Sequence, residues 1–406
     1  MNTLKFGNGE WYGKKDTILA YNDLNSNFKP LSFNFDRASS ATRVNKDGLI
    51  ETVGNGEPRI DYKDDSKGAL KLEPSRSNLI TYSEDFSQWS QNQTTIVLND
   101  IISPDGTLNA AKLTSTNAYS SIFKSGISAV SGSVYTLSCF FKNATSNEIT
   151  LRLVSSNDSR YIFNLSDLSI RSDGAFNSGF VSAKIDVFPN DWFRCSLTFT
   201  AASTTIGVNI YPKEQDLSEL NSVNLYGAQL EQGSYATSYI PTQGGVVTRV
   251  QEVVNNTNSL MSGLTDMAMF VDYQLPNGNS SSFRNQLGFR DNANANFYMI
   301  QFPSSNTHEF RYTGVSGVNV DMTPSISEQD FGLRRKLLYT KKGTTLKVFC
   351  NGVEVSTVTN ASATTFSTTT EILNAGNNYD IDMDIKEWKL YNNGFTDQEA
   401  IALTTL

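Results

Sequence analysis

The feature that most constrains the fold of this 406-residue chain is a long succession of short β-branched and aromatic runs. From Asn78 to Pro241 these runs alternate with Ser, Asn, Asp and Gly. The same sequence pattern continues toward the C-terminus. Runs of this length and composition favour β-strands, and the polar residues between them favour tight turns. The sequence therefore predicts an all-β chain.

The charge and cysteine composition excludes several classes of protein. The chain carries 33 basic and 41 acidic residues, so it lacks the basic footprint that nucleic-acid binding requires. No stretch approaches the roughly 20 apolar residues needed to span a bilayer, and the N-terminus lacks the apolar core of a signal peptide. Three cysteines, Cys139, Cys195 and Cys350, cannot complete a disulfide framework. We expect buried free thiols, folding in a reducing cytoplasm, and neither a nucleic-acid nor a membrane partner.

The pattern divides the chain into four predicted segments. Residues 1–75 have scattered aromatic residues and little periodicity, which favours an extended segment that becomes ordered by docking on a partner. Residues 76–241 suit a two-sheet jelly roll. Residues 242–258 are rich in Gly and polar residues and predict a linker, and residues 259–406 predict a second β-sandwich.

Two local signals stand out in the last segment. Asn351-Gly352 is the strongest hairpin signal in the chain, because both central residues of a type I′ turn need positive φ. Thr396 and Glu399 have the spacing of a capping box before the apolar run AIAL. We therefore expect a hairpin at Asn351-Gly352 and a short C-terminal helix.

The run from Ser39 to Trp89, SSATRVNKDGLIETVGNGEPRIDY and then LEPSRSNLITYSEDFSQW, resembles the segment shared by certain bacteriophage virion surface proteins. These are the head-spike, head-fibre and tail-fibre proteins. The resemblance implies a non-enzymatic structural component on the virion surface, made in the host cytoplasm and assembled as a homotrimer. Capsid or tail proteins would be the partners of the N-terminal segment. Head and tail locations both stay open, because both use this segment.

Within that segment, arginines alternate with acidic residues between Gly and Pro turn formers. Opposite charges at close spacing suit chains packed against one another better than a ligand pocket. We therefore predict docking or structural roles for Arg43, Arg59, Asp61 and Arg76. We predict the same for Trp11, one of the scattered aromatic residues of residues 1–75.

Residues 76–241 also resemble the carbohydrate-binding-module type of jelly roll, through NLITYSEDFSQW, SPDGTLNAAKLT, DWFRCSLTF and YGAQLEQGSYATSYIPT in that order. The final segment resembles a concanavalin-like or laminin-G sandwich, through KLLYTKKGTTLKVFCNGVEVST and KLYNNGFTDQEAIAL. The resemblance to carbohydrate-binding modules implies adhesion to host or environmental glycans. Aromatic rings can stack on sugars, although the tryptophans equally suit core packing. The candidate stacking residues are Trp89, Trp192, Tyr235, Tyr239 and Trp388.

An enzymatic alternative rests on one strand-like run. Asp382, Asp384 and Glu387 approximate the E-x-D-x-x-E strand of laminarinase-type glycosidases, which would make the protein a polysaccharide depolymerase. The match departs at Asp382, which stands in place of the nucleophilic Glu. A strand with one wet and one buried face explains the same alternation. With His308 as the only histidine, nucleophilic and zinc chemistry are not expected, and we predict no enzyme.

Calcium is a weak alternative at two places. Asp380, Asp382 and Asp384 alternate along one strand, which would separate neighbouring carboxylates by about 7 Å, too far for one ion without loop ligands. Asp291 lies in the polar loop FRDNANANF with Asn292 and Asn294. We expect no cofactor, with calcium as the exception to test.

Overall fold

The computed structural model describes residues 3–9, 11–22, 31–213, 220–255, 265–276, 287–291, 297–301, 309–313, 319–322, 332–359, 370–372 and 382–406. These residues form strands almost throughout, with one short α-helix, which confirms the predicted all-β class. The chain divides into two compact units. Unit 1 comprises Met1–Arg43, Val53–Ser75 and Val250–Leu406, and unit 2 comprises Val44–Thr52 and Arg76–Arg249. Strands β5 (Ala41–Val44) and β6 (Ile50–Val53) lie where the chain passes from one unit to the other.

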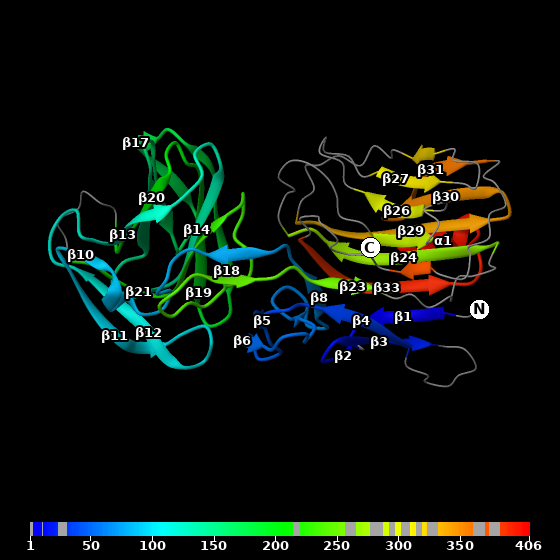
Figure 1. Cartoon of the computed structure of the whole chain (residues 1–406), viewed down its shortest axis with the longest axis horizontal. Coiled ribbons are helices and arrows are strands. Elements are labelled where there is room, and N and C mark those ends of the chain that lie inside the picture. The colour runs from blue at the N-terminus through cyan, green and yellow to red at the C-terminus, as the bar shows by residue number, and fades with distance from the viewer. Residues whose placement is uncertain are drawn as a thin grey trace. The chain divides into compact units, whose positions relative to one another are not determined.

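Unit 2 contains two six-stranded antiparallel sheets, drawn mostly in cyan and green in Figure 1. The first has the order β10 (Ser90–Asn92), β13 (Ser121–Ser128), β20 (Thr205–Tyr211), β15 (Glu148–Val154), β16 (Asp158–Asn164) and β17 (Ile170–Asn177). The second has the order β11 (Thr94–Ile102), β12 (Leu108–Ser115), β21 (Ser222–Gln232), β14 (Val134–Asn143), β19 (Trp192–Thr200) and β18 (Phe180–Phe188). Leu137 of β14 and Leu151 of β15 belong to one buried cluster, so the two sheets share a core.

A second apolar cluster lies on the other face of the β14-containing sheet. Successive side chains of a strand point to opposite faces. Cys139 belongs to the shared core, whereas its neighbour Phe140 packs with Trp192, Tyr226 and Tyr239. Val44 and Ile50 join the same cluster, which therefore includes the short excursion of the chain over residues 44–52. This face positions the site described below.

Short elements complete unit 2. Strand β9 (Arg76–Asn78) pairs antiparallel with β22 (Val247–Arg249), and the 3-10 helix η2 (Phe86–Gln88) begins after Asp85. The Asp85 carboxylate accepts a hydrogen bond from the Ser87 amide and so caps this helix. The chain thus enters and leaves the sandwich through two paired strands.

Unit 1 is built around a 12-stranded sheet. Its main path runs through β23 (Val253–Asn255), β4 (Leu31–Asp36), β3 (Thr17–Asn22), β1 (Thr3–Gly7), β33 (Met383–Tyr391), β24 (Met267–Gln274), β29 (Arg334–Lys342), β30 (Thr345–Cys350) and β31 (Val353–Val358). Off this path lie β2 (Tyr12–Lys14), β7 (Ile60–Asp61) and β8 (Ala69–Leu72). A five-stranded sheet has the order β28 (Asn319–Met322), β27 (Glu309–Thr313), β26 (Phe297–Gln301), β25 (Leu287–Asp291) and β32 (Thr370–Ile372).

The structure divides the chain differently from the predicted segments 1–75, 76–241, 242–258 and 259–406. The first strand, β1, pairs with the last, β33, and β8 also pairs with β33. The predicted linker supplies β22 and β23, and β23 pairs with β4. The aromatic residues of the N-terminal segment, such as Phe33, find their apolar partners in C-terminal strands, and a local pattern does not reveal such distant pairing. Docking of this segment on another protein stays a prediction.

Both local signals of the last segment are confirmed. Asn351 and Gly352 have φ values of 48° and 81° and connect β30 to β31. Thr396 caps the helix α1 (Asp397–Thr404), and its capping box with Glu399 is complete. No helix in the described part of the chain is long and apolar enough to cross a membrane.

Candidate functional site

The predicted stacking residues lie mostly in the interior. Trp89, Trp192, Tyr239 and Trp388 are only 3%, 1%, 3% and 1% exposed, so none of them offers a ring face to a sugar. Core packing, the alternative explanation for the tryptophans, is what the structure shows. Tyr235 is half-buried, and its ring lies 5.7 Å from the guanidinium of Arg76. That pair is a cation–π contact within unit 2.

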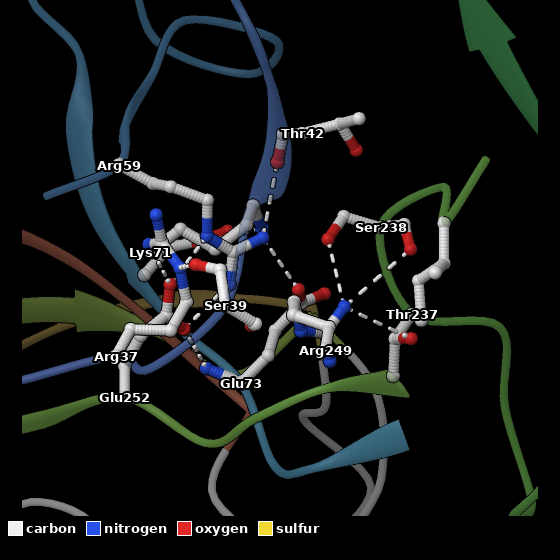
Figure 2. Close-up of polar contacts among 12 residues, drawn as sticks. Arg37, Ser39, Thr42, Arg59, Lys71, Glu73, Thr237, Ser238, Arg249 and Glu252 are labelled. Atoms are coloured by element: carbon white, nitrogen blue, oxygen red, sulfur yellow. Dashed lines mark hydrogen bonds and ion pairs between the residues drawn. The ribbon is translucent and has the colours of Figure 1, made fainter. Parts of the chain in front are cut away.

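Arg59, one of the predicted docking residues of unit 1, forms ion pairs within that unit. Arg59 is fully buried and forms ion pairs with Glu73 at 2.7 Å and with Glu252 at 2.5 Å (Figure 2). Arg37 pairs with the same Glu252 at 3.0 Å. Burial alone would lower the pKa of Arg59, but the two glutamates outweigh burial and raise it. This cluster joins three stretches of chain that are far apart in the sequence.

The other predicted docking residues are less uniform. Asp61 is buried, and its carboxylate accepts a hydrogen bond from the Lys63 amide. Trp11 is half-buried, and its indole N–H donates to the Gly68 carbonyl at 3.0 Å. Arg43 is half-buried as well. The contacts of Asp61 and Trp11 give these residues structural roles inside the chain, and their docking role stays a prediction.

Lysines form ion pairs with two carboxylates of the strand that resembles the glycosidase motif. Asp384 pairs with Lys71 at 2.8 Å, and Glu387 pairs with Lys389 at 2.7 Å. Burial raises the pKa of Asp384, with Lys71 opposing it. Asp382 is buried beside the start of β33.

The weak calcium candidates lie largely beyond the described residues. Asp380, Asn292, Asn294 and the single histidine His308 fall outside them, and Asp291 is the last residue of β25. Within the described ranges, no group of three or more His, Cys, Asp or Glu side chains is arranged to hold a metal ion.

Among the described residues, unit 2 contains a cavity of about 470 Å³. Small-molecule sites typically occupy about 300–1,000 Å³ and combine apolar surface with a few polar groups. This cavity has that combination, with carboxylates, amides and a hydroxyl beside two apolar side chains. Its lining residues are Glu84, Asp85, Leu98, Asn99, Asn109, Pro241, Thr242 and Gln243.

A chain of hydrogen bonds fixes Glu84 at the cavity wall. The hydroxyls of Tyr226 and Tyr239 lie 3.1 Å and 2.9 Å from Glu84 Oε1 and donate to it. Tyr239 in turn shares a 2.7 Å hydrogen bond with Ser83 Oγ, which accepts from the Thr242 amide at 2.8 Å. Tyr239 was a predicted glycan contact, and its position assigns it instead to holding Glu84.

A second carboxylate lies directly behind this wall. Asp105 Oδ2 is 3.0 Å from the Tyr226 hydroxyl and accepts from Asn109 Nδ2 at 2.9 Å. Burial alone would raise the pKa of Asp105, but hydrogen bonds from Thr107, Ser103 and Asn109 outweigh it and hold the pKa below its ordinary value. Asp105 is therefore ionised at neutral pH.

Tyr226 keeps its proton between the two carboxylates. Burial, together with the charges of Glu84 and Asp105, raises the pKa of Tyr226 well above its ordinary value. The single hydroxyl proton can serve only one of the two carboxylates at a time. The wall therefore keeps negative charge that its own hydrogen bonds do not fully satisfy.

Several hydrogen-bonding groups at the cavity have no partner among the residues that the structure describes. The Asn109 Oδ1 atom is buried without a hydrogen bond, and within the described ranges the Asn99 and Gln243 amides make no side-chain hydrogen bonds either. Asn99 lies at an irregularity in β11, between Val97 and Ile101, with φ of 55°. Such bulges re-aim side chains and are common beside functional sites.

Little in the sequence pattern predicts this site. Glu84 and Asp85 lie within NLITYSEDFSQW, where they carry the family resemblance without any sign of their neighbours. Tyr226 and Tyr239 follow more than a hundred residues later, and only the fold brings them to Glu84. Two adjacent acids with no basic residue nearby in sequence were the one available signal.

No protein-family model matches the chain, and no curated protein matches it in sequence. Among solved structures, it is similar to the carbohydrate-binding module CBM40 of the Ruminococcus gnavus IT-sialidase bound to α2,3-sialyllactose, with 12% identity, 37% of this chain and 92% of that chain covered, and a TM-score of 0.29. It is also similar to domain 4 of the arabinanase AbnA of Geobacillus stearothermophilus in complex with arabinotriose (16%, 43% and 84%, TM-score 0.33). A third is the LG4-5 pair of the mouse laminin α1 chain (9%, 69% and 89%, TM-score 0.25). Likenesses this weak carry no argument about what this chain binds.

Proposed function

We propose that this protein is a non-enzymatic structural component of a phage particle that projects β domains from the virion surface and adheres to glycans. The cavity of unit 2 is the proposed attachment point. Several copies on one particle would bind together, so that weak single sites give firm adhesion. A homotrimeric fibre, spike or capsid decoration, with capsid or tail proteins as neighbours, is part of the same proposal.

The observation that carries the glycan part is the set of free hydrogen-bonding groups around the cavity. Sugars present many hydroxyls, which both donate to carboxylates and accept from amides. Asn99 and Gln243 leave their amides available, while Leu98 and Pro241 supply apolar surface for the C–H groups of a ring. The virion part is supported by the resemblance of the Ser39–Trp89 segment.

A glycan array with the full chain displayed on multivalent beads tests the adhesion. The matched variants are Asn99→Gly at the cavity and Asn190→Gly away from it, because both asparagines have positive φ, 55° and 61°, which glycine adopts without strain. We expect binding to at least one glycan class, reduced by Asn99→Gly and unchanged by Asn190→Gly. An array without any binding, or binding that is indifferent to Asn99→Gly, would overturn adhesion at this cavity.

The assembly part has its own test. Sedimentation of the purified chain should give a trimer if the protein is a fibre or spike. A stable monomer at high concentration would contradict that state without affecting the cavity.

A further inference from the structure

We infer that the sugar held in the unit 2 cavity carries a free ammonium group, so that the ligand class is an amino sugar without N-acetylation. This inference rests on the proposed glycan-binding function and narrows it. It follows from the charge of the cavity wall rather than from its shape.

The wall of the cavity has negative charge and no internal counter-charge. Glu84 and Asp85 line the cavity, and Asp105 lies behind Tyr226. Within the described part of the chain, none of these three carboxylates forms an ion pair. No arginine or lysine is among the lining residues. Hydrogen bonds from neutral groups stabilise Glu84 and Asp105, but no cation among the described residues neutralises them, so a bound cation would gain charge–charge attraction at this wall.

The fixed position of Glu84 favours a directional cation. Tyr239 donates to Oε1, and Tyr226 shares its one proton between Oε1 and Asp105, while no group in the described part of the chain donates to Oε2. Asp85 likewise uses Oδ1 to cap η2, and none of the described residues donates to its Oδ2. Two oxygens therefore remain to accept the N–H groups of an ammonium, which are donors only.

The remaining lining suits the rest of a sugar ring. The Asn109 Oδ1 atom lacks a partner and can accept from a hydroxyl, and the amides of Asn99 and Gln243 can donate or accept. Acidic sugars would meet the carboxylates of Glu84 and Asp85 and are disfavoured by like charge. A bare metal ion is a poorer fit, because the described acidic side chains are not grouped to hold one.

The test compares three tetrasaccharides that differ in one substituent. Isothermal titration of the full chain would use a fully deacetylated β-1,4-glucosamine tetramer, its N-acetylated counterpart and cellotetraose, each at about 50 and 500 mM NaCl. We expect the deacetylated tetramer to bind most tightly and to weaken with salt, since exposed charge–charge attraction is screened at high ionic strength.

The matched variants are Glu84→Gln and Asp191→Asn. Each removes one negative charge, but Asp191 lies away from the cavity with its side chain 91% exposed. Losing a charge-assisted hydrogen bond should weaken binding of the deacetylated tetramer about ten- to a hundredfold in Glu84→Gln. Asp191→Asn should stay within about twofold. Asp85→Asn is the second cavity variant, in case Glu84→Gln loses its native thermal transition.

The outcomes distinguish the ammonium inference from the proposed glycan adhesion on which it rests. In one outcome, all three tetramers bind equally and Asn99→Gly abolishes this binding. That result would overturn the ammonium inference and leave the proposed glycan adhesion standing. Binding of none of the three, with a silent array, would remove the proposed function itself. Calcium chloride is also titrated alone. Calcium binding by the parent chain that is lost in Glu84→Gln would overturn the inference, since the counter-charge would then be a metal ion.

Discussion

Arg59 and Glu252 lie 193 residues apart in the chain and form a two-pronged ion pair in the interior of unit 1. Nε donates to Oε1 and Nη2 donates to Oε2, each at 2.5 Å, and neither side chain is exposed. Arg37 adds a third donor to the same carboxylate. Two buried arginines thus share the carboxylate of Glu252.

Replacing Glu252 by Gln should therefore destabilise unit 1 strongly. The change leaves two buried arginines short of a counter-charge, and removing one partner of a buried ion pair typically costs about 3–5 kcal/mol. Urea titration followed by hydrogen exchange of β33 peptides measures the effect. Glu148→Gln is the control, because its pair with Arg171 is partly exposed, and it should cost no more than about 1 kcal/mol. Equal effects of the two changes would contradict the structural role of the cluster.

The lowered pKa of Asp105 gives unit 2 a defined acid sensitivity. A carboxylate with a depressed folded-state pKa contributes stability above its unfolded pKa, about 3.9, and loses it as pH falls through the lower folded value. Asp105→Asn should melt at a lower temperature than the parent at neutral pH, and the gap should close below about pH 4. Thermal unfolding by circular dichroism between pH 7 and pH 2.5 measures this gap. A gap that is the same at every pH would show that Asp105 acts by packing alone.

Trp388 should behave as a core residue. It is buried and makes an edge-on contact with Phe33, with ring centroids 5.9 Å apart. Trp388→Ala should lower the free energy of unfolding by about 3–5 kcal/mol. Leu333→Ala, at a 59% exposed position, should change it by no more than about 0.5 kcal/mol. If Trp388→Ala instead keeps full stability and abolishes glycan binding, the stacking interpretation would return.

The sequence predicted what local physics determines. The positive φ values at Asn351 and Gly352 and the capping box of Thr396 and Glu399 each involve neighbouring residues, and all appear in the structure. The strand habit also follows from composition, because β-branched and aromatic runs pack well on a pleated surface. These features needed no knowledge of distant contacts.

The remaining features depend on pairings between distant parts of the chain. Nothing near Leu4 indicates that it lies opposite Leu390, and nothing near Glu84 indicates that Tyr239 will donate to it. Strand pairing has no sequence-separation rule of the kind that helices have, so the local pattern of the N-terminal strands does not reveal their core partners. The cavity could not be predicted for the same reason, because its lining residues come from four separate stretches of the sequence.

The pairing of β1 with β33 has a consequence for synthesis on the ribosome. Unit 2 is complete once Arg249 has been made, whereas β33 (Met383–Tyr391), the central strand on the main path of the unit 1 sheet, is made only later. Domains generally fold as units while the chain emerges. The sandwich of unit 2 can therefore fold first, and the strand β1 must wait until β33 has been made before it finds that neighbour. A ribosome that stops early would release a finished unit 2 attached to unpaired strands, which are prone to aggregate.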